Sequence, residues 1–176
     1  MILDFFHISA NLKKIPRQGW IDKLSMDKPE SVADHVFSMA MMGMIFSDLE
    51  NYDTGKILKI ILLHDLAESI IGDITPEQIS KEEKTTLENK AINKILNHLP
   101  ISLQKQYDAL WEEYQSNNSK EARIVHQLDK LEMALQAKIY SNDGYSKEKL
   151  DSFFNSARNE IKDSKLLELF TKISEK

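Results

Sequence analysis

The chain has 176 residues, of which 41% are apolar and 29% are charged, and its formal net charge is −5. This length and composition predict a soluble globular protein with one substantial core, and we expect a single domain over residues 1–176. The negative charge argues against binding to a nucleic-acid polymer, and the absence of cysteine excludes disulfides and thiolate metal sites.

The first residues of the chain bear on where the protein works. Residues 1–7 contain an acid and a histidine, whereas a signal peptide would have a basic leader and an apolar run there. No segment approaches the roughly 20 consecutive apolar residues that span a bilayer. We therefore expect a cytoplasmic protein without a membrane partner.

Apolar residues recur at helical spacing along most of the chain, and no segment has the alternation typical of strands. We predict a first helix at about 3–14, a second that starts near Pro29, and a third that contains residues 64 and 65 and ends at Gly72. Further helices are expected at about 80–99, 102–115, 119–140, 146–161 and 163–174. An irregular segment is expected over residues 16–27. Residues 75–78 and 80–83 both have the pattern of a capping box. The predicted fold class is all-α, a compact helical bundle.

The pair His64-Asp65 is the most informative feature of the sequence. Apolar residues lie on nearly every side of the helical wheel from residue 57 to 71, which indicates a buried helix. An ionised Asp65 on such a helix needs a positive charge nearby, because burying an unpaired carboxylate is costly. The positions one turn away are not cationic: they are Ile61, Leu62, Glu68 and Ser69. A divalent metal with imidazole and carboxylate ligands would supply the charge.

Two other predicted helices contain further candidate ligands. His35 lies about two turns into the second helix, and Asp129 lies on a helix that should face the core. Two imidazoles and two carboxylates suit Mn, Fe, Co or Zn better than calcium, whose ligands are normally all oxygen. Four protein ligands around a six-coordinate ion would leave positions for water and substrate.

Each candidate also has an ordinary structural interpretation. A lone His35 is more often a polar core or surface histidine than a metal ligand. Asp129 could pair with His126 one turn earlier, and Lys130 and Glu132 are interpreted as a solvent-exposed face. The individual residues are weak signals, whereas their order and spacing are specific.

The order of His35, His64-Asp65 and Asp129 resembles the HD superfamily of metal-dependent phosphohydrolases. Longer strings are similar to the HD-domain 5′-deoxynucleotidases, whose pattern H-D-x-x-E-x-x-x-G-D matches residues 64–73. Other matching strings are residues 12–20, 29–35, 81–84, 110–114 and 127–133. The motif-bearing core covers about residues 10–140. Residues 145–176 carry no assigned motif, and we expect helices there that cover the core or a dimer seam.

The resemblance implies a metal site and a catalytic acid. His35, His64, Asp65 and Asp129 would hold one divalent transition metal per chain, which could be Co, Mn, Fe or Zn, with Mg as a further option. Glu68 matches the catalytic acid of the family. Glu68 lies four residues after His64 and three after Asp65, so we expect all three to project from one helix face, which would set Glu68 next to the metal-bound water.

The resemblance also implies three substrate-binding residues. Arg17 matches a phosphate-binding arginine, and a planar guanidinium suits a bidentate phosphate contact. Trp20 matches a tryptophan that packs on the sugar and disfavours a 2′-hydroxyl, although two residues separate it from the arginine, unlike in the bacterial branch. Asp73 matches a substrate-contacting aspartate, and its ordinary interpretation is a turn residue.

The implied function is that of a metal-dependent, homodimeric 5′-deoxynucleotidase, which converts deoxyribonucleoside 5′-monophosphates to deoxyribonucleoside and phosphate. One alternative is an HD phosphohydrolase that acts on a cyclic nucleotide, a triphosphate or an alarmone. Another is a non-catalytic nucleotide-binding module, but such a module would be expected to lose a ligand or Glu68. A helical interaction protein would leave Asp65 without a cation.

Overall fold

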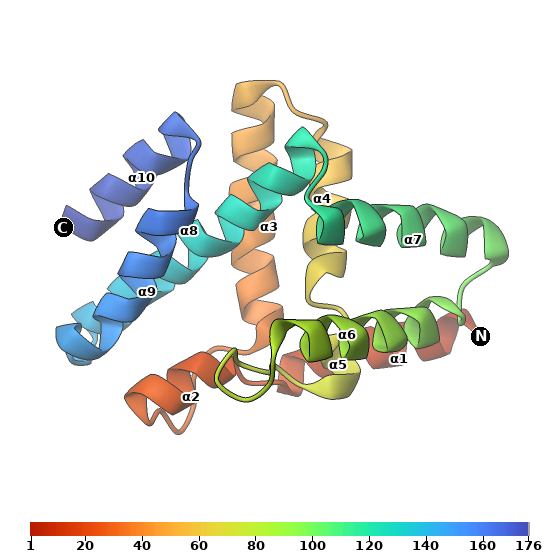
Figure 1. The fold of residues 1–176 in the computed structure, drawn as a ribbon, viewed down its shortest axis with the longest axis horizontal. Helices are drawn as coiled ribbons and strands as arrows, with labels where there is room; N and C mark the ends of the chain where they lie inside the picture. The colour runs from red at the N-terminus through yellow and green to blue at the C-terminus, as the bar shows by residue number, and fades with distance from the viewer. Residues whose placement is uncertain (176) are drawn as a thin grey trace.

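The structure, a computed structural model, describes residues 1–175 as a set of packed α-helices joined by short loops (Figure 1). The first half contains α1 (Ile2–Ala10), the 3-10 helix η1 (Asn11–Lys14), α2 (Gln18–Leu24), α3 (Val32–Glu50), α4 (Thr54–His64) and α5 (Glu68–Ile71). The second half contains α6 (Lys81–Leu96), α7 (Ile101–Ser116), α8 (Lys120–Asn142), α9 (Lys147–Glu160) and α10 (Ser164–Glu175). The predicted all-α fold class is confirmed. Within the described range, no helix combines the length and the apolar character needed to cross a membrane.

The centre of the fold is formed by α3, α4 and α8, which pack against one another. In Figure 1, α3 and α4 run side by side and α8 lies across α3. Met39, Ile61 and Leu128 are fully buried between these helices. The close approach of α3 to α4 occurs at Gly43, where an added Cβ would lie 2.4 Å from the Cδ1 atom of Ile61. These three helices therefore hold the first turn of α3, the last turn of α4 and the middle of α8 in fixed relative positions.

The start of α3 differs from the prediction. Ser31 caps the helix, since its hydroxyl accepts from the Asp34 N–H and the Asp34 carboxylate accepts from the Ser31 N–H. Residues 29–31 are extended because they pair with the segment before α2: the Arg17 N–H donates to Glu30 and the Val32 N–H to Ile15. The helix thus begins at Val32 rather than near Pro29, and His35 lies in its first turn rather than two turns in.

Three other local predictions differ from the structure. The helix that contains His64 does not continue to Gly72, because Asp65 has φ −106° and ψ 9° and residues 65–67 form tight turns before α5. The segment over 16–27 is not irregular, because α2 forms there and buries Trp20 and Leu24. Of the two predicted capping boxes, only that of Ser80 and Glu83 begins a helix, α6, whereas residues 75–78 form a turn.

The C-terminal helices α9 and α10 pack on α8. Leu150 and Ala157 of α9 and Leu166 of α10 are fully buried. A second, smaller hydrophobic cluster joins α2 to α8 and α9 and includes Trp20 and Tyr140. Residues without an assigned motif therefore complete one wall around the C-terminal half of α8.

Candidate metal centre

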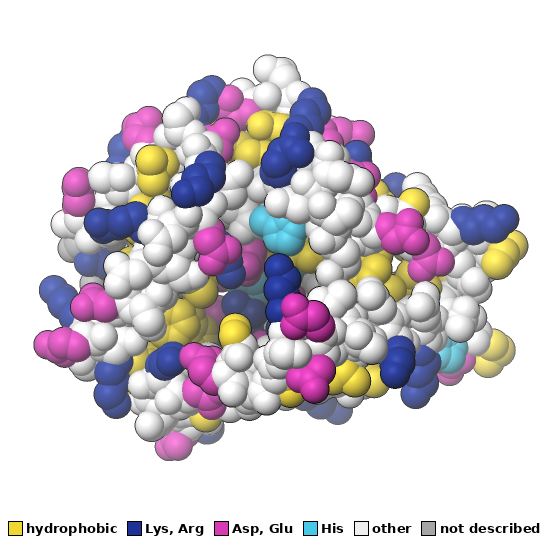
Figure 2. Space-filling view, viewed as in Figure 1, with side chains coloured by type: hydrophobic (Ala, Val, Ile, Leu, Met, Phe, Trp, Pro, Cys, Tyr) yellow, Lys and Arg dark blue, Asp and Glu magenta, His cyan; other side chains and the backbone are white. Residues whose placement is uncertain are grey.

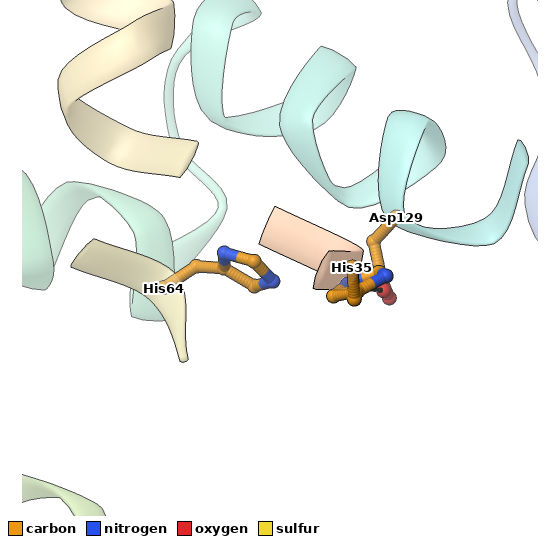
Figure 3. A group of neighbouring side chains, drawn as sticks. All are labelled: His35, His64 and Asp129. Carbon is orange, nitrogen blue, oxygen red and sulfur yellow. Dashed lines mark ion pairs between the residues drawn. The ribbon is translucent and has the colours of Figure 1, made fainter. Parts of the chain in front are cut away.

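Three of the predicted metal ligands come together from three helices. His35 lies in the first turn of α3, His64 is the last residue of α4 and Asp129 lies in the middle of α8. Their candidate ligand atoms all lie within 4.8 Å of one another. Figure 3 shows the ring of His64 directed toward His35 and Asp129. Both rings are buried, with the His35 residue 0% exposed.

The fourth predicted ligand, Asp65, faces the same nitrogen atoms. Its Oδ2 atom lies 3.1 Å from Nε2 of His64 and 3.8 Å from Nε2 of His35. The same oxygen lies 3.6 Å from the Nη1 atom of Arg17. The end of α4 at His64 makes this possible, because Asp65 leaves the helix and turns back toward the histidine that precedes it.

The hydrogen bonds of both rings leave Nε2 available to the centre. Nδ1 of His64 donates to the carbonyl oxygen of Ile61 at 2.7 Å, and Nδ1 of His35 lies 2.5 Å from Oε2 of Glu132. Among the described residues, four buried atoms of this cluster have no hydrogen-bond partner: Nε2 of His35, Nε2 of His64, Oδ2 of Asp65 and Oε2 of Glu68. Buried polar atoms are costly without partners, and a divalent cation would satisfy this donor set. The residues therefore fit a metal.

The charged groups at the centre also favour the binding of a cation. Burial opposes the ionisation of both Asp65 and Asp129. Even so, the charge of His64 holds the pKa of Asp65 below its usual value, and the charge of Lys130 does the same for the pKa of Asp129. Burial and Arg17 oppose protonation of His35, yet Asp129 and Glu132 outweigh them and raise its pKa to about 9. Anionic groups thus surround this ring, and either a proton or a metal must offset their charge.

Two neighbours of Asp129 do not form the predicted solvent-exposed face. Glu132 is 1% exposed and contacts His35, while Nζ of the partly buried Lys130 lies 3.1 Å from Oδ2 of Asp129. His126 does not pair with Asp129, since its Nε2 atom lies 3.0 Å from the carbonyl oxygen of Tyr114. The prediction fails because α8 is covered by α3 on one side and by α9 and α10 on others.

Glu68 begins α5 and is 2% exposed. Burial and the charges of Asp65 and Asp73 raise the pKa of Glu68 well above its usual value. Nζ of Lys84 lies 3.7 Å from Oε1 of Glu68 and donates to the carbonyl oxygen of Ile74 at 2.8 Å. The turn after α4 means that Glu68 does not share one helix face with His64, but both residues line the same cavity.

This site cavity has a volume of about 580 Å³. It is lined by every predicted site residue except His35, namely Arg17, Trp20, His64, Asp65, Glu68, Asp73 and Asp129. Figure 2 shows a hollow on this face of the molecule, where basic, acidic and histidine side chains gather. Sequence reasoning missed several lining residues, among them Lys84, Tyr114, His126 and Phe153. Lys84 and Tyr114 lie within the matching strings 81–84 and 110–114, which could have indicated them, and His126 was considered only as a partner of Asp129. Phe153 comes from a segment without a motif.

The three predicted substrate-binding residues lie along one side of the site cavity. The Gln18 N–H donates to the carboxylate of Asp73 at 2.7 Å, which ties the loop after α5 to the start of α2 next to Arg17. Trp20 is 2% exposed, and its indole N–H donates to Oε1 of Glu30 at 2.9 Å. The ring of Trp20 packs against Phe153 with a centroid distance of 4.1 Å. Its N–H is therefore already used within the protein.

Comparison with known proteins places this arrangement in a family. The HD domain model matches residues 9–169. The 5′-deoxynucleotidase HDDC2 of Dictyostelium discoideum is 44% identical over 167 residues, which cover 89% of this chain and 87% of that protein. The protein of the same name from Homo sapiens is 36% identical over 173 residues, which cover 98% and 84%. A conserved hypothetical protein from Pyrococcus furiosus has a similar structure, with a TM-score of 0.80, 30% identity and 99% coverage of both chains. The chain therefore belongs to the HD domain family.

Proposed function

We propose that this protein is a metal-dependent 5′-deoxynucleotidase, a phosphoric monoester hydrolase that acts on deoxyribonucleoside 5′-monophosphates. The observation that carries the proposal is a group of buried atoms on His35, His64, Asp65 and Glu68 that have no hydrogen-bond partner within residues 1–175, set beside Arg17 at the site cavity. The name 5′-deoxynucleotidase, shared by relatives from several eukaryotes, supports the substrate class.

The proposed ligands of one divalent metal are His35, His64, Asp65 and Asp129. Their nitrogen and oxygen atoms suit Mn, Fe, Co or Zn, and Mg is a further option. When bound, such a cation polarises a phosphoryl oxygen and lowers the pKa of water. Arg17 lies beside Asp65, so its guanidinium could donate hydrogen bonds to a phosphate group that is bound next to the proposed metal ligands. Its guanidinium would offset charge on the phosphoryl group.

Glu68 is the proposed catalytic acid. In hydrolysis, the oxygen of water bonds to phosphorus, the bond between phosphorus and O5′ breaks, and O5′ needs a proton. Because its pKa is raised, the carboxyl group of Glu68 holds a proton that it can give to O5′. It then regains a proton from the attacking water, so that the group ends as it began.

The remaining proposed contacts concern the sugar and the assembly. Asp73 is proposed to contact the substrate, and the ring of Trp20 to pack on the sugar where a 2′-hydroxyl would crowd it. Only the ring can do so, because the indole N–H donates to Glu30. The predicted cytoplasmic location stays a prediction.

We also propose a homodimer, as the family resemblance implies. An apolar face consists of Phe37, Met41, Ile45 and Leu49, spaced four residues apart on α3, together with Leu169 on α10. These side chains are between 43% and 71% exposed, and all of them except Phe37 line an apolar groove between α3, α8 and α10. Monomeric proteins rarely expose a continuous apolar patch, and a twofold dimer would bury the same patch on both copies.

The proposed function is tested by chromatographic analysis of the products formed from dAMP, AMP, dATP and a cyclic nucleotide, with Co²⁺, Mn²⁺ or Mg²⁺, together with a phosphate assay, because opening a cyclic phosphodiester yields a monophosphate and no free phosphate. We expect release from the monophosphates only, with dAMP preferred. Glu68→Gln should lower kcat by about 100- to 10,000-fold, the usual contribution of a positioned acid or base, and should still bind metal. Conversion of dATP or of the cyclic nucleotide to any product would favour another HD phosphohydrolase. Metal binding without conversion of any substrate would indicate a non-catalytic module.

A further inference from the structure

Helix α8 contacts the ring of His35 at both nitrogen atoms. Oδ1 of Asp129 lies 3.3 Å from Nε2, and Oε2 of Glu132 lies 2.5 Å from Nδ1. The two acids are three residues apart, which places them on the same side of α8 one turn from each other. His35 is 0% and Glu132 is 1% exposed, so this contact is formed entirely inside the protein.

The contact with Glu132 determines which nitrogen of His35 can bind a cation. A neutral imidazole has one N–H and one lone pair, and a carboxylate can only accept a hydrogen bond. An N–H at Nδ1 that donates to Glu132 therefore leaves the lone pair on Nε2, directed at the centre. His64 achieves the same result through the carbonyl oxygen of Ile61. Of the two rings, only His35 depends on a side chain that can be replaced.

A second acid, Glu30, belongs to the same group. Carboxylate oxygens of Glu30 and Glu132 and a ring nitrogen of His35 lie within 4.8 Å of one another. Glu30 is held from the other side, since its Oε1 atom accepts from Trp20 and its N–H donates to the hydroxyl of Tyr140 at 2.9 Å. These contacts connect the second hydrophobic cluster, which contains Trp20 and Tyr140, to His35.

We propose that Glu132 is a positioning residue that fixes the tautomer and the orientation of the His35 ring so that Nε2 faces the metal. Neither Glu132 nor Glu30 is among the described residues that line the site cavity, which favours a role through His35 over direct contact with the substrate. The proposal rests on His35 being a ligand, as the proposed function requires. It adds that the affinity of the centre for metal depends on the carboxylate of Glu132, which is not itself a ligand.

The test measures metal affinity and does not require catalysis. Calorimetric titration with Mn²⁺ or Co²⁺ would compare wild type with Glu132→Ala, Glu132→Gln and the control Leu131→Ala. Leu131 is also buried on α8 but belongs to the hydrophobic core. We expect Glu132→Ala to lower the affinity by about 10- to 100-fold, as loss of such a partner usually does, and Glu132→Gln to restore part of it. Leu131→Ala should lower the unfolding temperature while leaving the affinity unchanged.

Two further measurements separate positioning from a merely structural role. In a His35→Ala background, Glu132→Ala should reduce the affinity no further, because the ring it orients is gone. In the Zn²⁺-loaded protein, the Nδ1–H proton of His35 should give a slowly exchanging NMR signal in wild type and Glu132→Gln. That signal should be lost in Glu132→Ala. If Glu132→Ala does not fold, the Gln and Glu30→Ala variants carry the same comparison, with a smaller loss of affinity expected.

The proposal is overturned if Glu132→Ala binds metal as tightly as wild type, or if it weakens binding equally without His35. It is also overturned by two metal ions per chain, because Glu30, His35 and Glu132 would then be ligands of a second site. Failure of the proposed function gives a different pattern. In that case the wild type binds metal and shows these effects but releases no phosphate.

Discussion

Arg17 and Asp65 face each other inside the site cavity, with Nη1 of the arginine 3.6 Å from Oδ2 of the aspartate. The two residues reach this position from unrelated segments. Arg17 precedes α2 in the extended stretch that pairs with Glu30, and Asp65 lies in the turn after α4. The pair thus puts a guanidinium beside a proposed metal ligand. A phosphate oxygen could therefore contact the guanidinium of Arg17 and the proposed metal ion at the same time.

Replacement of Arg17 should impair substrate binding at this place. Hydrogen bonds between charged groups contribute about 1.5–3 kcal/mol, so Arg17→Ala should lower kcat/KM for dAMP by about 10- to 100-fold. Arg17→Lys should recover only part of the loss, because an ammonium lacks the planar pair of donors. Steady-state kinetics would measure both. The control is Lys120→Ala, because Lys120 is not among the residues that line the site cavity and its Nζ lies 3.6 Å from Oε1 of Glu121. Equal losses in the two alanine variants would contradict the assignment.

Stability should depend on pH through Glu30. Burial and the charge of Glu132 raise its pKa from 4.5 to about 7 in the folded protein. A raised carboxyl pKa means that the folded state binds more protons than the unfolded state between these values. The stability contributed by Glu30 is therefore full below about pH 4.5 and is lost as the pH rises through about 7.

Glu30→Gln should remove this loss while keeping an oxygen that accepts from Trp20. Its free energy of unfolding, relative to that of wild type, should increase by on the order of 1–3 kcal/mol from about pH 5 to about pH 8. Urea denaturation at several pH values would measure the difference. A difference that stays constant with pH would show that Glu30 has an ordinary pKa.

The close approach of α3 and α4 should make Gly43 intolerant of a side chain. In Gly43→Ala, the new methyl group would collide with Ile61, and the resulting shift should cost about 1–3 kcal/mol of unfolding free energy. Gly55→Ala is the matched control, because the nearest atom to its Cβ is Oδ1 of Asp53 at 3.5 Å. That variant should gain up to about 1 kcal/mol from helix propensity. Equal urea midpoints in the two variants would contradict the packing described for α3 and α4.

The proposed dimer should depend on the apolar face of α3. Ile45→Lys places a charge at the middle of that face and should convert a dimer into a folded monomer, because burying an unpaired ammonium is costly. Analytical ultracentrifugation would measure the mass, and circular dichroism the helix content. Leu87→Lys on α6 is the control, since Leu87 is 40% exposed but lies outside the face. A monomeric wild type would refute the dimer.

Local patterns in the sequence determined much of this protein. The helices of the C-terminal half were predicted to within about three residues, because apolar spacing, Ser80 as a cap and Pro100 are signals carried by neighbours in the chain. The family was also predicted from the sequence, by the order of His35, His64-Asp65 and Asp129 along the chain. That these residues bind a metal stays a prediction, although the structure brings three of them within reach of one ion.

Tertiary contacts decided the rest, because they join residues far apart in the chain. The helix that contains His35 begins three residues later than predicted, since residues 15–17 pair with residues 30–32. Glu132 is buried rather than exposed because His35, 97 positions away, lies against it. Periodicity shows which side of a helix is apolar, but it does not show which partner covers a charged residue on another side. That depends on how α3, α4 and α8 pack, and no short stretch of the sequence contains this information.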